Sequence, residues 1–200
     1  MKFQISYNMA DLEEALRVAQ QTAEYADVLQ LGSLLLMSNG KQAIFRFREM
    51  FPDKELWVDS RLTDNWMSSI DFFATCGVKQ ISILAGISNK MIQQFTSAAH
   101  SQGLAVSLDL IASPSPEQAV FDAQALDVDS IIYRNPMLKD ESVCMTERWA
   151  SVRGNTQLPI YISGNMALDA LDTIKEMAPY GLIVGNLITN ASNPIEMAQK

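Results

Sequence analysis

The sequence predicts an α/β protein in which eight parallel strands, each followed by a helix, close into a barrel. Short β-rich runs recur at roughly 25-residue spacing, and an amphipathic segment follows each run. Several runs are apolar almost throughout, which is typical of parallel strands that are covered on both faces. We therefore expect a (β/α)8 TIM barrel that forms a compact single domain over residues 1–200.

The predicted strands are rich in branched and aromatic residues. In chain order they span residues 3–7, 27–31, 55–58, 80–84, 105–110, 130–133, 159–162 and 182–184. An open, doubly wound sheet is the alternative fold. Against it, residues 6–10, which follow the first strand, lack the glycines of a dinucleotide-binding turn.

Capping and spacing signals predict helices between the strands. Asp11 precedes apolar residues at helical spacing, and Ser88 or Asn89 precedes another such segment, as N-capping residues do. Gly77 and Gly181 follow helical segments, where glycine commonly ends a helix. The order of strand and helix signals therefore agrees with repeated β/α units.

Charge and hydropathy exclude several classes of partner. The net charge of -8 disfavours nucleic acid and anionic membrane, because no cluster of Lys and Arg offsets the repulsion from phosphates. The longest apolar runs, such as 34–37 and 81–85, are far shorter than the roughly 20 residues that span a bilayer. The amino-terminal residues do not resemble a signal peptide. We expect a cytoplasmic protein.

The cysteines and the single histidine give little support for catalysis. Cys76 and Cys144 fit no metal-ligand spacing, and we expect both to be buried free thiols. His100 lies in a helical pattern rather than at a strand end, so we expect it at the surface. A Ser/His/Asp or Cys/His mechanism is therefore disfavoured.

Polar residues follow nearly every predicted strand, at the end where β/α barrels carry their chemistry. The densest group is residues 59–64, in which Asp59 and Asp64 flank Arg61. The other strand ends contribute Asn8, Gln30, Asp109, Arg134, Ser163, Gly164, Asn165, Gly185 and Asn186. The glycines after the last two strands allow close backbone approach ahead of helix N-termini, as in a phosphate cradle. Ordinary β-to-α turns are the alternative.

Five segments carry a family resemblance. Residues 3–8 match an opening Leu-Gln-Val-Ala-Leu-Asp, residues 30–33 match Glu-Ile-Gly-Thr, and residues 59–64 match the hallmark Asp-x-Lys-x-x-Asp. Residues 108–111 match Val-Asp-Leu-Ile, and residues 184–189 match the closing Val-Gly-Ser-Ala-Ile-Thr. On these motifs the chain resembles, end to end, the 3-hexulose-6-phosphate synthase and 3-keto-gulonate-6-phosphate decarboxylase group, relatives of orotidine 5'-phosphate decarboxylase.

The resemblance implies a barrel that dimerises with its active sites at the subunit interface, where Asp64 would reach into the partner's site. It also implies a phosphorylated ketose as substrate and an enediolate intermediate stabilised by magnesium. In the synthases, the enediolate of ribulose 5-phosphate attacks formaldehyde. In the decarboxylases, the enediolate forms by loss of carbon dioxide.

The chain departs from the family pattern at the chemically central positions. Asn8 replaces an Asp, Gln30 replaces a Glu that helps to hold the metal, Arg61 replaces the hallmark Lys, Arg134 replaces a His, and Asn165 replaces a Gly. The two changes from carboxylate to amide remove about the charge that magnesium would neutralise. Because Mg²⁺ favours anionic oxygen ligands, we expect metal binding to be weakened or lost. If magnesium is retained, Asp59 and Gln30 would hold it.

These observations lead to two hypotheses about function. In the first, the chain is a lyase of the hexulose-6-phosphate synthase or decarboxylase kind. Arg61 and Arg134 would then stabilise oxyanion charge, and Asp59, Asp64 or Asp109 would transfer protons. In the second, it is a catalytically altered sugar-phosphate-binding paralogue, in which Arg61 only pairs with Asp59 and Asp64. Both hypotheses assign ligand binding to Asn8, Gln30, Ser163, Gly164, Asn165, Gly185 and Asn186.

Overall fold

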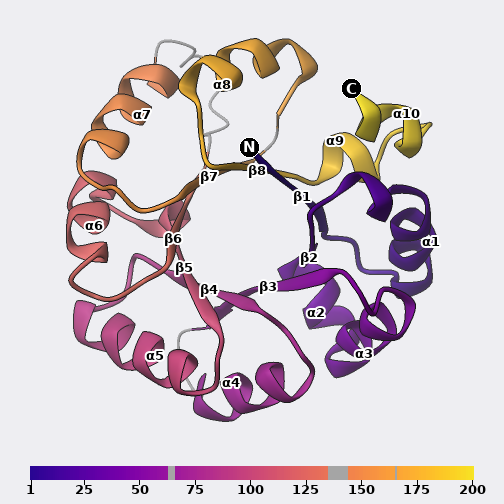
Figure 1. The fold of residues 1–200 in the computed structure, drawn as a ribbon, viewed down its shortest axis with the longest axis horizontal. Coiled ribbons are helices and arrows are strands. Elements are labelled where there is room, and N and C mark those ends of the chain that lie inside the picture. Colours follow the sequence, from indigo (N-terminus) through magenta and orange to yellow (C-terminus); the bar gives the residue numbers. More distant parts are fainter. Residues whose placement is uncertain (63–65, 135–143, 165) are drawn as a thin grey trace.

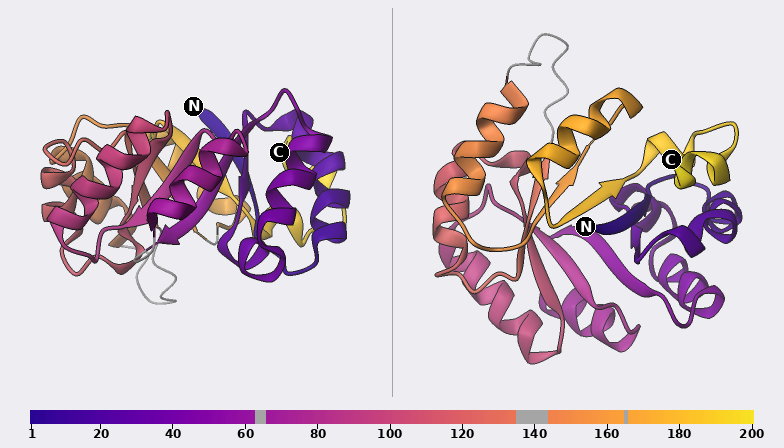
Figure 2. Two further views of the ribbon diagram at one scale, coloured as in Figure 1. Left: turned by 90° about the horizontal axis from the view of Figure 1, so that it is seen from below. Right: turned by 45° about the horizontal axis from the view of Figure 1, so that its top comes forward.

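The computed structural model describes residues 1–62, 66–134, 144–164 and 166–200, and it confirms the predicted barrel. The eight strands pair in sequence order, all in parallel, and the last strand closes the ring on the first. Helices surround the ring of strands (Figure 1). Seen from the side, they run along the wall of the barrel (Figure 2).

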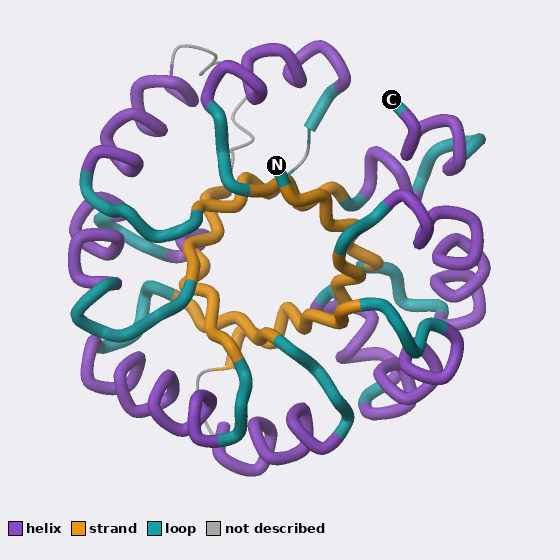
Figure 3. Tube along the Cα trace, viewed as in Figure 1, coloured by secondary structure: helices purple, strands orange, loops and turns teal. Residues whose placement is uncertain are grey.

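Seven of the eight strands agree with the predicted ranges to within one residue at each end. The strands are β1 Lys2–Tyr7, β2 Val28–Leu31, β3 Glu55–Leu62, β4 Gln80–Leu84, β5 Ala105–Asp109, β6 Ser130–Arg134, β7 Ile160–Ser163 and β8 Gly181–Val184. They form the inner ring in Figure 3. Alternate strand residues pack outward against the helices and form the main hydrophobic core.

The described helices follow the strands as expected. They are α1 Leu12–Thr22, α2 Ser33–Asn39, α3 Lys41–Met50, α4 Trp66–Thr75, α5 Asn89–Ser101, α6 Pro116–Ala123, α7 Cys144–Gly154, α8 Leu171–Met177, α9 Asn186–Thr189 and α10 Pro194–Gln199. Short 3-10 helices span Ala23–Tyr25, Leu110–Ala112 and Leu168–Ala170. In the described part of the chain, none of the helices has the length and apolar character needed to cross a membrane.

The predicted end of the third strand is wrong. Strand β3 continues past Val58 to Leu62, because a bulge keeps the polar residues in the sheet. Val58 pairs with Ile81 and Leu62 with Ile83, so four steps along β3 oppose two steps along β4. Within the bulge, Arg61 has a left-handed backbone with a φ of 44°. Asp59 and Arg61 therefore lie on a bulged strand rather than in a loop beyond it.

The capping predictions are confirmed in part. Asp11 accepts a hydrogen bond from the backbone N–H of Glu14, and Ser88 rather than Asn89 caps α5. Gly181 does not end a helix. It is the first residue of β8, and a Cβ atom at this position would collide with the ring of Tyr161. Close packing inside the barrel, rather than a helix terminus, therefore requires this glycine.

The barrel interior is partly apolar and partly polar. Val28, Trp57, Ile132, Tyr161 and Ile183 form a small cluster separate from the main core, with the rings of Trp57 and Tyr161 in edge contact. A buried polar group consists of Gln80, Ser107 and Ser130. Gln80 Nε2 donates to Ser130 Oγ at 2.8 Å and also to Ser107 Oγ.

Gln4 is fully buried, yet neither its side-chain oxygen nor its nitrogen has a hydrogen-bond partner among the described residues. We expect Gln4→Met to raise the free energy of unfolding by about 1–2 kcal/mol. The methionine side chain fills a similar volume and does not bury an unpaired amide. Gln80→Met is the matched control and should be destabilising, because it leaves Ser107 and Ser130 with fewer partners. Urea denaturation measures both. A loss of stability in Gln4→Met would contradict the prediction and indicate that internal water pairs the amide.

Cys76 is a free, buried thiol, as predicted, and burial raises its pKa. The side chain of Cys144 lies outside the described residues, so the prediction for this cysteine stays open.

Candidate active site

Four charged side chains converge at the carboxyl ends of three strands. Asp59 and Arg61 lie on the bulged part of β3, Asp109 is the last residue of β5, and Arg134 is the last residue of β6. In a parallel barrel, all the carboxyl ends meet at one rim. Residues that are far apart in the sequence can therefore contact each other directly.

The first pair of the cluster is formed within β3. Arg61 Nε lies 3.1 Å and 3.2 Å from the two carboxylate oxygens of Asp59, and Arg61 Nη2 lies 2.9 Å from Oδ2. Ser82 on β4 donates a hydrogen bond to Asp59 Oδ1 at 3.0 Å. The Asp59 carboxylate is buried, whereas the side chain of Arg61 is 31% exposed. Arg61 Nη1 takes part in none of these hydrogen bonds.

Arg134 joins four strands of the barrel. Its Nε lies 3.1 Å from each carboxylate oxygen of Asp109, and its Nη2 lies 2.5 Å from Asp109 Oδ2. The same Nη2 is 3.5 Å from Asp59 Oδ2, and Nη1 donates to Ser163 Oγ on β7 at 3.3 Å. Asp109 is fully buried, and its Oδ1 also accepts from the backbone N–H of Ile111.

The formal charges of the cluster balance, and the surroundings of Arg134 keep its guanidinium charged. Burial by itself would lower the pKa of Arg134. Hydrogen bonds from the guanidinium to Asp109, together with the charges of Asp109 and Asp59, outweigh burial and raise the pKa. Arg134 is therefore a permanent cation in this site, and two guanidinium groups neutralise two carboxylates.

The two amide residues lie near this rim without joining the cluster. Asn8, directly after β1, accepts a hydrogen bond at Oδ1 from the backbone N–H of Leu34 at 2.8 Å and so caps the start of α2. Gln30 is buried on β2, in register with Ser6 and Trp57. Among the hydrogen bonds of the described residues, none links either amide to the charged cluster.

The glycines of the predicted phosphate cradle follow adjacent strands. Gly164 comes directly after β7 and has a φ of 131°, a conformation that favours glycine. Gly185 follows β8, and Asn186 begins α9. Because β7 pairs with β8, the two turns lie at neighbouring positions of the rim. The Ser163 contact with Arg134 connects this region to the charged cluster.

Two predicted site residues, Asp64 and Asn165, lie outside the described residues. Ser82, which holds Asp59 in place, was not among the predicted site residues. Its signal was a hydroxyl in the middle of the apolar run 81–85, at a strand position that alternation turns toward the barrel interior.

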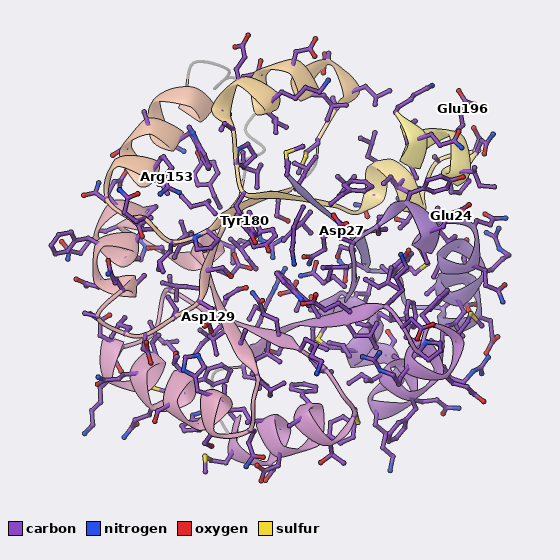
Figure 4. All side chains as sticks on the ribbon, in the orientation of Figure 1. Glu24, Asp27, Asp129, Arg153, Tyr180 and Glu196 are labelled. Carbon is purple, nitrogen blue, oxygen red and sulfur yellow. The ribbon has the colours of Figure 1, made fainter. Side chains whose placement is uncertain are left out.

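His100 lies far from this cluster. Its Nε2 is 2.8 Å from Asp129 Oδ2, and Asp129 directly precedes β6. Asp27, Asp129 and Tyr180 precede their strands and mark the amino-terminal rim (Figure 4). The histidine is therefore associated with the end of the barrel opposite the charged cluster.

The donor set does not fit the divalent cation that the family resemblance implies. Both oxygens of Asp59 and both oxygens of Asp109 already accept hydrogen bonds from guanidinium groups. Gln30 would add only a neutral amide oxygen, which is a poor ligand for Mg²⁺. In the described part of the chain, no group of three or more His, Cys, Asp and Glu residues is arranged to hold a metal.

Comparison with known proteins confirms the resemblance over the whole chain. No family model matches the sequence. The 3-hexulose-6-phosphate synthase of Bacillus subtilis is 24% identical over 202 residues, which cover 100% of this chain and 96% of the relative. The enzyme of the same name from Mycobacterium gastri is 20% identical, and the alignment covers 100% of this chain and 97% of that enzyme.

Solved structures show the same fold. A crystal structure of 3-hexulose-6-phosphate synthase matches with a TM-score of 0.89 and 20% identity, covering 100% of this chain and 97% of that one. The 3-keto-L-gulonate-6-phosphate decarboxylase of Vibrio cholerae matches with a TM-score of 0.83 and 18% identity, covering 99% and 94%. Orotidine 5'-monophosphate decarboxylase from Methanocaldococcus jannaschii matches with a TM-score of 0.81 and 19% identity, covering 99% and 95%.

Proposed function

We propose that the protein is a carbon–carbon lyase that joins ribulose 5-phosphate and formaldehyde, or cleaves their product, through an enediolate. The observation that carries this proposal is the Asp59, Arg61, Asp109 and Arg134 cluster at the carboxyl rim, next to the turns that contain Gly164 and Gly185. The name shared by the curated relatives supports the choice of reaction.

The proposed reaction begins with proton transfer. A carboxylate takes a proton from the carbon beside the ketone of ribulose 5-phosphate, and the electrons of that C–H bond form the enediolate. The enediolate carbon then attacks the carbonyl carbon of formaldehyde. A new C–C bond forms, the carbonyl electron pair moves to oxygen, and that oxygen takes up the proton. Nothing is oxidised or reduced overall.

The geometry distributes these tasks among the charged residues. The Nη1 group of Arg61 makes no hydrogen bond to the described carboxylates, so we assign this guanidinium, with that of Arg134, to the developing oxyanion. Asp59 is the proposed proton carrier on the described part of β3, and Asp64 is the other candidate. Asp109 is fully buried and makes three hydrogen bonds to Arg134, so we assign it to positioning Arg134.

The remaining predicted residues complete the proposal. Ser163, Gly164, Asn165, Gly185 and Asn186 would bind the phosphate, while Asn8 and Gln30 would contact the sugar. We also propose a single-domain, cytoplasmic homodimer that works without a resident metal ion. The family resemblance supports the dimer, and the guanidinium contacts of both carboxylates support independence from metal.

One observation favours a second candidate function. Each oxygen of Asp59 and Asp109 contacts a guanidinium group, which leaves fewer lone pairs to take a proton from a substrate. A catalytically altered protein that binds a sugar phosphate without turnover would have such a site. In this second candidate function, the protein binds the same phosphosugar but does not catalyse the reaction.

The two candidates are separated by incubating the protein with ribulose 5-phosphate and formaldehyde, in EDTA and in magnesium, and measuring hexulose phosphate. We expect product in both conditions. Calorimetric binding of ribulose 5-phosphate without product would favour the binding protein. Release of carbon dioxide from 3-keto-gulonate 6-phosphate would assign the decarboxylase branch. If the protein neither binds nor converts any of these phosphosugars, the proposal is refuted.

A further inference from the structure

We infer that the guanidinium of Arg134 takes the place of a divalent cation in this site, and that removing it creates a metal site between Asp59 and Asp109. The inference rests on the proposed function only for calling this cluster the active site. The inference starts from the position of Arg134 Nη2. Arg134 Nη2 lies 2.5 Å from Asp109 Oδ2 and 3.5 Å from Asp59 Oδ2, so it touches carboxylates from two different strands.

The two carboxylates are held close together. The two distances to Arg134 Nη2, 2.5 Å and 3.5 Å, set an upper limit of about 6 Å on the separation of the Oδ2 atoms of Asp59 and Asp109. Both residues are buried, at 4% and 0% exposure. Two like charges at this separation in a buried site repel each other unless a cation lies between them. Arg134 is that cation.

Other hydrogen bonds fix one oxygen of each carboxylate independently of Arg134. Asp59 Oδ1 accepts from Ser82 Oγ, and Asp109 Oδ1 accepts from the backbone N–H of Ile111. Ser82 on β4 and the 3-10 helix that follows β5 thus each hold one oxygen of a carboxylate. Shortening Arg134 would leave Asp109 Oδ2 without a guanidinium contact, near Asp59 Oδ2, which keeps its contact with Arg61.

The charges are equivalent to those of a metal site. Arg61 and Arg134 together carry two positive charges, the charge of one magnesium ion, against the two negative charges of Asp59 and Asp109. A divalent cation that entered beside them would be repelled by both guanidinium groups and would have to displace their hydrogen bonds. The native site therefore disfavours a divalent cation between these two carboxylates.

Manganese tests this inference without any substrate, because the EPR signal of free Mn²⁺ reports binding directly. We expect no stoichiometric binding to the native protein. Arg134→Ala should bind one ion per chain at least about tenfold more tightly, because the Asp109 carboxylate is then free of guanidinium contact and one positive charge fewer repels the ion. Adding Asp109→Asn to that variant should abolish the gain.

Arg46→Ala is the matched control. Arg46 pairs with Glu13 at 2.8 Å on the surface, so its loss changes the net charge equally but frees only one exposed carboxylate. It should behave like the native protein. If Arg134→Ala does not fold, Arg134→Gln tests the same vacancy, and circular dichroism identifies which variants are folded.

Two results would overturn the inference. The first is stoichiometric Mn²⁺ binding by the native protein. The second is binding by folded Arg134→Ala or Arg134→Gln that is no tighter than binding by Arg46→Ala. Neither measurement uses a phosphosugar, so failure here is distinguishable from failure of the proposed reaction.

Discussion

Asp59→Asn is expected to lower kcat/KM for the condensation of ribulose 5-phosphate with formaldehyde by about 10²- to 10⁴-fold. The substitution removes the proposed proton carrier and the carboxylate that orients Arg61 through three short contacts. The fold should survive, because the amide has the same shape and its oxygen can still accept from Ser82. Steady-state kinetics, with a thermal melt of each variant, measures the effect.

Asp27→Asn is the matched control for this change. Asp27 accepts a hydrogen bond from the backbone N–H of Phe3 at the amino-terminal rim, away from the charged cluster. Its activity should equal that of the native protein. If Asp59→Asn retained native kcat/KM while correctly folded, the assignment of Asp59 would be wrong and the proton would have to move through another group.

Gly185→Val is expected to weaken binding of ribulose 5-phosphate by about 100-fold, because hydrogen bonds to a charged group contribute roughly 1.5–3 kcal/mol each. A side chain at this position would keep the phosphate from the backbone amides after β8. The fold should tolerate the change, since a Cβ atom would lie 3.4 Å from the nearest atom, the backbone oxygen of Ser6. Calorimetric titration measures the affinity.

Gly154→Val provides the comparison. Gly154 ends α7, and a Cβ atom there would have no neighbour within 4 Å in the described part of the chain, so the added side chain would lie in open space. Its affinity for the phosphosugar should be native. Unchanged affinity in Gly185→Val would locate the phosphate elsewhere and remove the last two strands from the proposed site.

Local patterns in the sequence were sufficient for the barrel. The apolar runs and their regular spacing predicted all eight strands, because a strand covered on both faces needs apolar residues at nearly every position. They failed at β3, where the polar residues 59–61 look like the start of a loop. Pairing with β4 and the hydrogen bond from Ser60 Oγ to the Ser82 carbonyl keep that segment in the sheet. This pairing is a long-range interaction that local composition does not reveal.

The sequence by itself determined the order of the strands, the rim that carries the charged residues and the resemblance to sugar-phosphate lyases. Only the tertiary structure decided that Arg134 contacts Asp109 and Asp59, that Ser82 supports Asp59, and that Asn8 caps α2. Residue types and their spacing along the chain indicate which groups reach the carboxyl-terminal rim of the barrel. The pairing among those groups depends on strand register and on the bulge in β3, which exist only after the barrel has closed.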